Sequence, residues 1–131
     1  NVLIINSDIY WQNKNLKDAK KLIKNFYKYN KAYLLLSERC NSFGIKKETG
    51  DFILKNNKIF RFKKGNDVFF FSGLQMLNLD IFKNFNEKKF SFNLIWDYLI
   101  NKNLLYGQNM NSNWYHVGDI NGLKIAKKLE S

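Results

Sequence analysis

The stretch NVLIINSDIYW (residues 1–11) runs from the apolar residues Val2 to Ile5 into the polar sequence Asn6-Ser7-Asp8. A continuous apolar run of strand length is typical of a β-strand that is covered on both faces, as in parallel sheets. In open α/β sheets, ligands bind just beyond the carboxyl ends of the strands. The stretch therefore predicts a buried strand with a polar tip at Asp8, and it favours an α/β fold.

The next segment has the spacing of a helix that covers such a strand. From Asn15, a residue type that caps helices, to about Tyr29, apolar side chains recur at helical spacing and lysines fill the other face. Asp18 falls in the first turn, where the helix dipole favours a negative charge. KAYLLLS (residues 31–37) is a second apolar run. Strand, helix and strand in this order predict a βαβ unit.

The rest of the chain continues this pattern without a linker or a repeat. Residues 51–62 alternate around Asn56-Asn57, which predicts a β-hairpin, and DVFFFSGLQM (67–76) predicts a strand interrupted at Ser72-Gly73. The other expected elements are helices at 79–85, from 91 or 93 to about 100, and from 119 to about 129, with short strands at 104–110 and 114–117. The sequence predicts one α/β domain, residues 1–131, with a mixed, mostly parallel sheet flanked by helices.

Composition narrows the classes of function. The formal net charge of +11 suggests an anionic partner, but all basic residues except Arg39 and Arg61 are lysines, scattered along the whole chain. Nucleic-acid-binding proteins more often cluster their basic residues and use arginine, so a DNA or RNA binder is a disfavoured alternative. Cys40 is the lone cysteine, which fits a reducing cytoplasm. No apolar run approaches the roughly 18 residues of a membrane helix, so we expect no membrane partner.

Several short phrases follow one another in an order that resembles a known family. They are Asn6-Ser7-Asp8, Gly50-Asp51-Phe52, Phe71-Ser72-Gly73-Leu74-Gln75, the set Phe90, Ser91, Asn93, Trp96 and Asp97, then Leu105-Tyr106-Gly107, and finally Trp114, His116, Val117 and Gly118. In order and spacing they resemble the sugar-1-phosphate nucleotidyltransferases. The nearest branch looks like the N-acetylmuramate-1-phosphate uridylyltransferases, also described as mannose-1-phosphate guanylyltransferase-like.

The resemblance implies a Rossmann-like fold and a reaction. In that reaction a sugar 1-phosphate attacks the α-phosphate of an NTP, pyrophosphate leaves, and an NDP-sugar forms with the help of Mg²⁺. UTP is the favoured nucleotide and GTP the alternative; UDP-N-acetylmuramate for cell-wall recycling is the favoured product. The family's glycine-rich nucleotide-binding loop precedes the Asn-x-Asp strand, and the glycines of this sequence form no such loop. We therefore expect a partial domain, inactive alone, that an N-terminal segment or a second chain completes.

The resemblance also assigns metal-site residues, and each has a structural alternative. Asp8 is the expected catalytic residue and Mg²⁺ ligand, because carboxylate oxygens suit this ion, but a capping role is the alternative. His116 stands where related enzymes carry a second metal-binding Asp. It either contacts a phosphate, holds a water on the metal, or packs beside Trp114. Asp119 either caps the last helix or serves as a weak second metal ligand.

Substrate-binding residues are expected on the strand and hairpin phrases. Gly73 either lets its backbone reach the sugar or marks a bulge, and Ser72 would add a hydroxyl. Asp51 either accepts hydrogen bonds from sugar hydroxyls or is solvated beside a turn. Asn93 caps a helix or binds the sugar, and Asp97, on the same helix face, would pair with a lysine. A catalytically inactive sugar-phosphate-binding or regulatory module remains the main alternative function.

Overall fold

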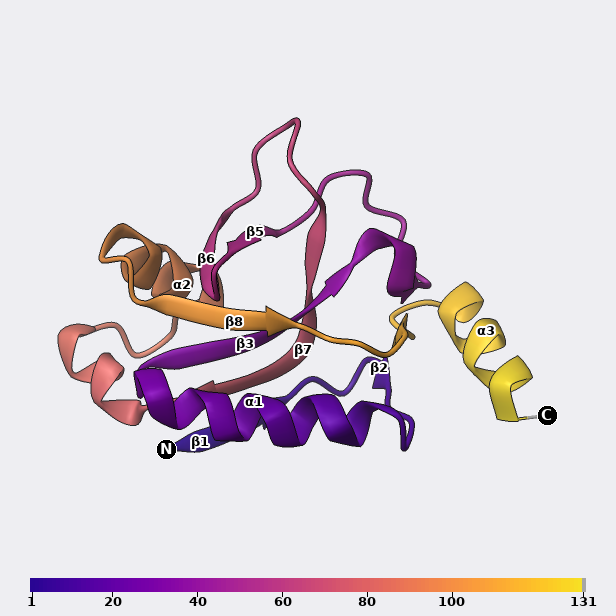
Figure 1. Cartoon of the computed structure of the whole chain (residues 1–131), viewed down its shortest axis with the longest axis horizontal. Helices are drawn as coiled ribbons and strands as arrows, with labels where there is room; N and C mark the ends of the chain where they lie inside the picture. The colour runs from indigo at the N-terminus through magenta and orange to yellow at the C-terminus, as the bar shows by residue number, and fades with distance from the viewer. Residues whose placement is uncertain (131) are drawn as a thin grey trace.

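A six-stranded sheet forms the centre of the protein (Figure 1). The computed structural model describes residues 1–130, so Ser131 lies outside the description. The strand order is β1-β7-β3-β8-β6-β5. The bounds are β1 (Val2–Ile5), β3 (Ala32–Glu38), β5 (Phe52–Lys55), β6 (Lys58–Arg61), β7 (Phe69–Leu77) and β8 (Leu105–Asn109). The predicted α/β fold, with a mixed sheet, flanking helices and a hairpin, is confirmed.

A small three-stranded sheet, β2-β9-β4, continues from the carboxyl ends of β1, β3 and β8 (Figure 1). It consists of β2 (Ile9–Tyr10), β4 (Ser42–Phe43) and β9 (Trp114–His116). The helices are α1 (Asn15–Tyr29), α2 (Phe92–Asn101) and α3 (Ile120–Glu130), with two 3-10 segments, η1 (Arg39–Asn41) and η2 (Leu79–Asn84). No helix within residues 1–130 is both long and apolar enough to cross a membrane.

The predicted direction of the strands needs a correction. Strand β7 runs antiparallel between β1 and β3, and within residues 1–130 the parallel pair of the main sheet is β3 with β8. Strands β1 and β3 still point the same way, so the expected strand–helix–strand unit exists but is split by β7. The expectation of a mostly parallel sheet was wrong because an apolar run reports burial on both faces, not the direction of the neighbouring strand.

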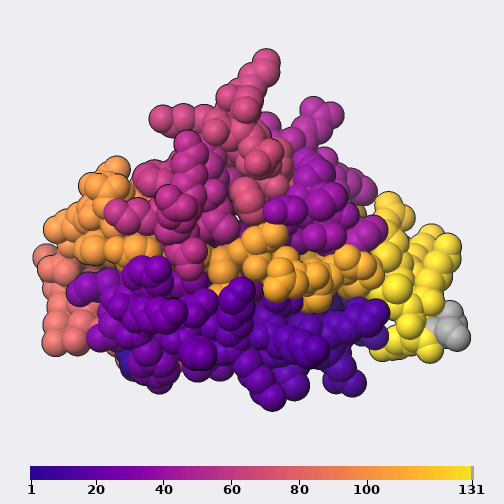
Figure 2. All heavy atoms as spheres, viewed as in Figure 1, coloured from indigo at the N-terminus to yellow at the C-terminus, as the bar shows by residue number. Residues whose placement is uncertain are grey.

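Strand β3 is buried on both faces, as predicted. Leu34 and Leu36 face a core cluster built with Trp96 of α2. Tyr33 and Leu35, on the alternate positions, face a second cluster built with Phe26 of α1. Helix α1 lies along this second face, and its part of the chain covers the lower part of the molecule in the space-filling view (Figures 1 and 2). The protein is therefore layered as α1, sheet and α2.

Local sequence signals explain two of the element boundaries. Asn56 and Asn57 both have positive φ, 48° and 65°, as a tight two-residue hairpin turn requires, and asparagine tolerates this conformation. The hydroxyl of Ser91 accepts a hydrogen bond from the backbone N–H of Asn93, so Ser91 caps α2. The hairpin turn is confirmed, and of the two predicted cap residues, Ser91 and Asn93, the structure shows Ser91.

Strand β1 differs from its prediction. It lies at the edge of the sheet, and Leu3 and Ile5 are 43% and 57% exposed. Val2 and Ile4, on the other side of the strand, pack against the core. The exposed side chains line an apolar groove of about 410 Å³ that Leu16 of α1 also borders. An apolar, uncovered edge strand favours pairing with another chain.

We expect the change Ile5→Lys to reduce concentration-dependent self-association of the chain, because a charged side chain on an edge strand disfavours strand addition. The unfolding free energy should change by no more than about 0.5 kcal/mol, since the side chain is exposed. Sedimentation velocity over a concentration series measures the first effect. Leu79→Lys, at a similarly exposed leucine of η2, is the matched control. Equal reductions in both variants would argue against an edge-strand effect.

Candidate functional site

A cavity of about 450 Å³ opens beyond the carboxyl end of β1. The residues lining it include most of the predicted site: Asp8, Asp51, Asn93, His116 and Asp119. They come from widely separated parts of the chain, and the small sheet, the hairpin and α2 bring them together. The fold thus gathers these side chains at one place, while the role of each remains a prediction.

Asp8 and His116 meet because β2 pairs antiparallel with β9. Ile9 lies opposite His116 in this pairing, and the N–H of Val117 donates to the carbonyl of Asp8 at 2.8 Å. Asp8 Oδ2 lies 3.2 Å from His116 Nε2. The imidazole also lies beside the ring of Trp114, with the ring centroids 5.9 Å apart. His116 therefore both packs beside Trp114 and faces the carboxylate.

The carboxylates at the cavity could hold a magnesium ion only if a substrate and water supplied the remaining ligands. Within residues 1–130, no three His, Cys, Asp or Glu side chains are grouped so as to hold a metal ion. Asp8 and Asp119 nevertheless line one cavity. Proteins often hold Mg²⁺ through one or two carboxylates, with waters and substrate phosphates completing the octahedron. Two carboxylates in a cavity suit that mode, and the Mg²⁺ assignment stays a prediction.

The Asp119 carboxylate is already engaged by two partners. Its Oδ1 accepts a hydrogen bond from the backbone N–H of Gly122 at 2.8 Å, which caps α3, and its Oδ2 lies 3.1 Å from Lys46 Nζ. The Gly122 hydrogen bond, followed by the interaction with Lys46, lowers the pKa of Asp119 below its ordinary value of 3.8. The capping alternative thus describes its geometry here.

This lowered pKa gives a prediction for the pH dependence of the α3 start. Because the folded-state pKa lies below the unfolded one, the ionised carboxylate stabilises the cap at every pH above 3.8, and this contribution is lost as the pH falls through the folded value. Carboxyl ¹³C NMR should give a midpoint for Asp119 below 3.8. In Lys46→Gln the midpoint should rise but stay below 3.8, because the Gly122 hydrogen bond remains. An unchanged midpoint would remove Lys46 as a cause.

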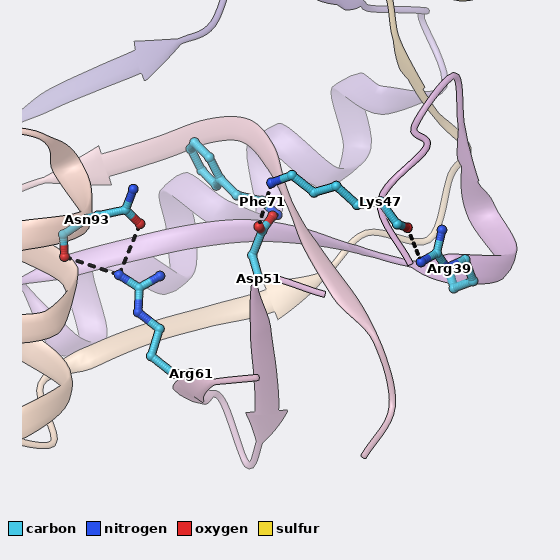
Figure 3. A network of polar contacts seen from close by, with 6 residues as sticks. All are labelled: Arg39, Lys47, Asp51, Arg61, Phe71 and Asn93. Atoms are coloured by element: carbon cyan, nitrogen blue, oxygen red, sulfur yellow. Dashed lines mark hydrogen bonds and ion pairs between the residues drawn. The ribbon is translucent and has the colours of Figure 1, made fainter. Parts of the chain in front are cut away.

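Asp51 ties the hairpin to β7 rather than standing solvated beside a turn. Its Oδ2 accepts a hydrogen bond from the backbone N–H of Phe71 at 3.1 Å, and its Oδ1 lies 3.1 Å from Lys47 Nζ (Figure 3). Both carboxylate oxygens thus have partners within the chain. A sugar hydroxyl would reach Asp51 most easily by replacing Lys47.

An arginine of the hairpin fixes the orientation of Asn93. The guanidinium of Arg61 donates to Asn93 Oδ1 at 3.0 Å and to the Asn93 carbonyl at 3.1 Å, and it pairs with Asp97 at 2.6 Å. Asp97 was expected to pair with a lysine, and its partner is this arginine. Figure 3 shows the amide nitrogen of Asn93 on the side away from Arg61. Asn93 therefore keeps a donor group free of Arg61 at the cavity wall.

Ser72 and Gly73 do not line the cavity. Gly73 has φ +90°, and a β-carbon there would lie 2.9 Å from Ile9 Cγ1 and 3.0 Å from Asn6 Cβ. Its carbonyl accepts a hydrogen bond from Asn6 N–H at 2.8 Å. Ser72 is fully buried, and its hydroxyl has no hydrogen-bond partner within residues 1–130, while its carbonyl accepts from Trp114 Nε1 at 2.9 Å. The bulge alternative describes Gly73, where the β3–β7 register shifts, and the substrate-binding roles of both residues stay predictions.

Two cavity residues were missed by the sequence analysis. Lys46 and Lys47 lie in the connection between β4 and β5 and line the cavity together with Gly44. They were treated as part of the scattered lysine surface. The sequence feature that could have identified them is their place just before the Gly-Asp-Phe phrase, between Gly44 and Gly50.

Comparison with known proteins supports the fold. No model of a known protein family matches the sequence, and no curated protein does. A solved structure described as that of a glucose-1-phosphate thymidylyltransferase from Bacillus anthracis, in complex with sucrose, matches with a TM-score of 0.73 at 17% identity. The match covers 97% of this chain and 53% of that one, so the chain spans about half the length of that protein.

Proposed function

We propose that this chain forms the sugar-phosphate half of a sugar-1-phosphate nucleotidyltransferase. The main support is one observation: the tip of β1, with Asp8, opens into a cavity that Asp51, Asn93 and His116 also line. A fold like that of a glucose-1-phosphate thymidylyltransferase supports the reaction class. The proposed reaction joins a sugar 1-phosphate to the α-phosphate of an NTP and releases pyrophosphate.

The proposed chemistry depends on positioning and charge more than on covalent steps. In phosphoryl-group transfer, the protein aligns the attacking and leaving oxygens and neutralises the charge that develops. A bound Mg²⁺ would supply part of that neutralisation. Asp8, with its side chain 48% exposed at the cavity, is the residue that we assign to hold it. Asn93, oriented by Arg61, is assigned to a sugar hydroxyl.

The proposal also names the nucleotide and the sugar that the enzyme uses. We assign recognition of the nucleotide base to polypeptide outside these residues, because the chain matches only about half of the similar structure. UTP is the favoured nucleotide and GTP the alternative. N-acetylmuramic acid 1-phosphate is the favoured sugar, on the resemblance of the Trp114 and Asn93 phrases, and cell-wall recycling is the corresponding proposed role.

A substrate panel tests this function. The complete gene product would be incubated with UTP, GTP or dTTP and with N-acetylmuramic acid, mannose or glucose 1-phosphate, with and without Mg²⁺. Pyrophosphate release and the NDP-sugar are measured together. We expect turnover that requires Mg²⁺ and that is fastest for UTP with N-acetylmuramic acid 1-phosphate. Absence of pyrophosphate release from every combination would contradict the enzyme assignment.

A second candidate is an inactive sugar-phosphate-binding module. The observation that favours it is the engagement of the acidic groups, since Asp8 faces His116 and Asp119 caps α3 while pairing with Lys46. Calorimetric titration with the three sugar 1-phosphates separates the two candidates. Binding of a sugar 1-phosphate without any turnover would support the module.

A further inference from the structure

The connection between β4 and β5 holds two lysines at the cavity. It begins at Gly44, which has φ +77° and packs so closely against the carbonyl of His116 that a β-carbon would overlap it. Arg39 donates a hydrogen bond to the carbonyl of Lys47 (Figure 3). The backbone of the connection is thus anchored at both of these points. The side chains of Lys46 and Lys47 are nevertheless 74% and 62% exposed.

The two lysines pair with carboxylates from different parts of the lining of the same cavity. Lys46 Nζ lies 3.1 Å from Asp119 Oδ2 at the start of α3, and Lys47 Nζ lies 3.1 Å from Asp51 Oδ1 at the start of the hairpin. All four residues line the cavity. An anion in this cavity is therefore close to both flexible side chains, because both line it.

These ion pairs are easy to open. Exposed pairs between lysine and a carboxylate contribute little to stability. Each carboxylate also keeps a backbone partner when its lysine leaves, because Asp119 accepts from the N–H of Gly122 and Asp51 from the N–H of Phe71. Displacing a lysine therefore leaves no carboxylate without a hydrogen bond.

We propose that Lys46 and Lys47 form a phosphate-binding pair, in which each lysine leaves the carboxylate that it contacts in this structure and binds a phosphate monoester. A phosphate monoester suits two ammonium groups because it carries nearly two negative charges and three strong acceptor oxygens at neutral pH. This proposal adds a phosphate-binding role to the proposed function. It rests on that function for the choice of a sugar phosphate as the ligand. Binding of the anion also frees Asp51 for a sugar hydroxyl.

The test uses three probes and two matched variants. The chain is titrated calorimetrically with inorganic phosphate, glucose 1-phosphate and glucose. We expect Lys46→Gln/Lys47→Gln to bind both phosphates about tenfold or more weakly than the wild-type chain, because two charge-assisted contacts are lost. Lys55→Gln/Lys58→Gln, on the exposed hairpin, removes the same charge outside the cavity lining and should stay within about twofold. Amide NMR spectra verify that both variants fold.

A second readout reports the exchange of partners directly. The carboxyl ¹³C signals of Asp51 and Asp119 should shift when phosphate is added to the wild-type chain. In Lys46→Gln/Lys47→Gln, the addition of phosphate should leave both signals unchanged. Tight glucose 1-phosphate binding by that variant would overturn the lysine pair and leave the proposed function standing. Phosphate binding that needs the lysines, with no gain in affinity from the sugar, would support the pair and contradict the sugar-phosphate function. No binding of either phosphate to the wild-type chain would overturn both.

Discussion

Replacing Asp18 with alanine should lower the free energy of unfolding by about 3 kcal/mol, because buried donors lose a charged acceptor. Asp18 is only 3% exposed. Its carboxylate accepts hydrogen bonds from the N–H groups of Asn111 and Ser112, at 2.9 and 3.2 Å, and from the Ser112 hydroxyl at 2.5 Å. In the alanine variant these donors have no partner on α1. The segment that leads into β9, and so to His116, loses these three hydrogen bonds to α1 and keeps the two that Asn15 Nδ2 donates to Ser112 Oγ and to the Asn113 carbonyl.

Thermal denaturation followed by circular dichroism measures this effect. A loss of about 3 kcal/mol corresponds to a fall of roughly 10 °C in the melting temperature for a domain of this size. Asp18→Asn keeps one acceptor oxygen and should fall between alanine and wild type. Asp67→Ala, at an exposed aspartate, is the matched control and should change the stability by no more than about 0.5 kcal/mol. A melting temperature for Asp18→Ala equal to that of this control would refute the anchoring role.

Asp18 also marks the limit of what periodicity predicts. The sequence placed it correctly in the first turn of a helix, where its favourable effect seemed local. Its actual partners lie 93 and 94 residues away, and no local pattern reports them. The same limit applies to the sheet. The hairpin, α1 and β3 follow from local spacing, whereas the insertion of β7 between β1 and β3 depends on contacts that only the folded chain reveals.

In the candidate site too, the sequence identified some contacts correctly and missed others. Asp8 and His116, 108 residues apart, were selected together because both belong to phrases that resemble one family, and the structure brings them into contact. Gly73 was selected because a glycine in a strand signals close approach, but the approaching groups are Asn6 and Ile9 of the same chain. Lys46 and Lys47 belong to no phrase, so only their spatial position identifies them. In this site, the sequence phrases thus identified the acidic residues but missed the two lysines.

The change Asp8→Asn should abolish most of the proposed Mg²⁺-dependent pyrophosphate release while leaving the fold intact. We expect turnover to fall by about two to three orders of magnitude, comparable to the loss of one electrostatic group at a reacting centre. The fold should tolerate the change because the backbone carbonyl of Asp8 keeps its hydrogen bond from the N–H of Val117, the residue that follows β9. The side chain itself is 48% exposed and faces His116.

Two controls separate a metal-binding role from a structural one. His116→Asn removes the imidazole but leaves the Asp8 carboxylate, so it should retain more activity than Asp8→Asn and require no more Mg²⁺ than the wild-type enzyme. Asp67→Asn makes the same chemical change at an exposed aspartate and should leave turnover unchanged. Because Mg²⁺ requires oxygen ligands, a rise in the Mg²⁺ concentration for half-maximal activity is the expected signature of Asp8→Asn. Near wild-type turnover in this variant would remove Asp8 from the metal site, and a large fall in its melting temperature would assign the residue a structural role instead.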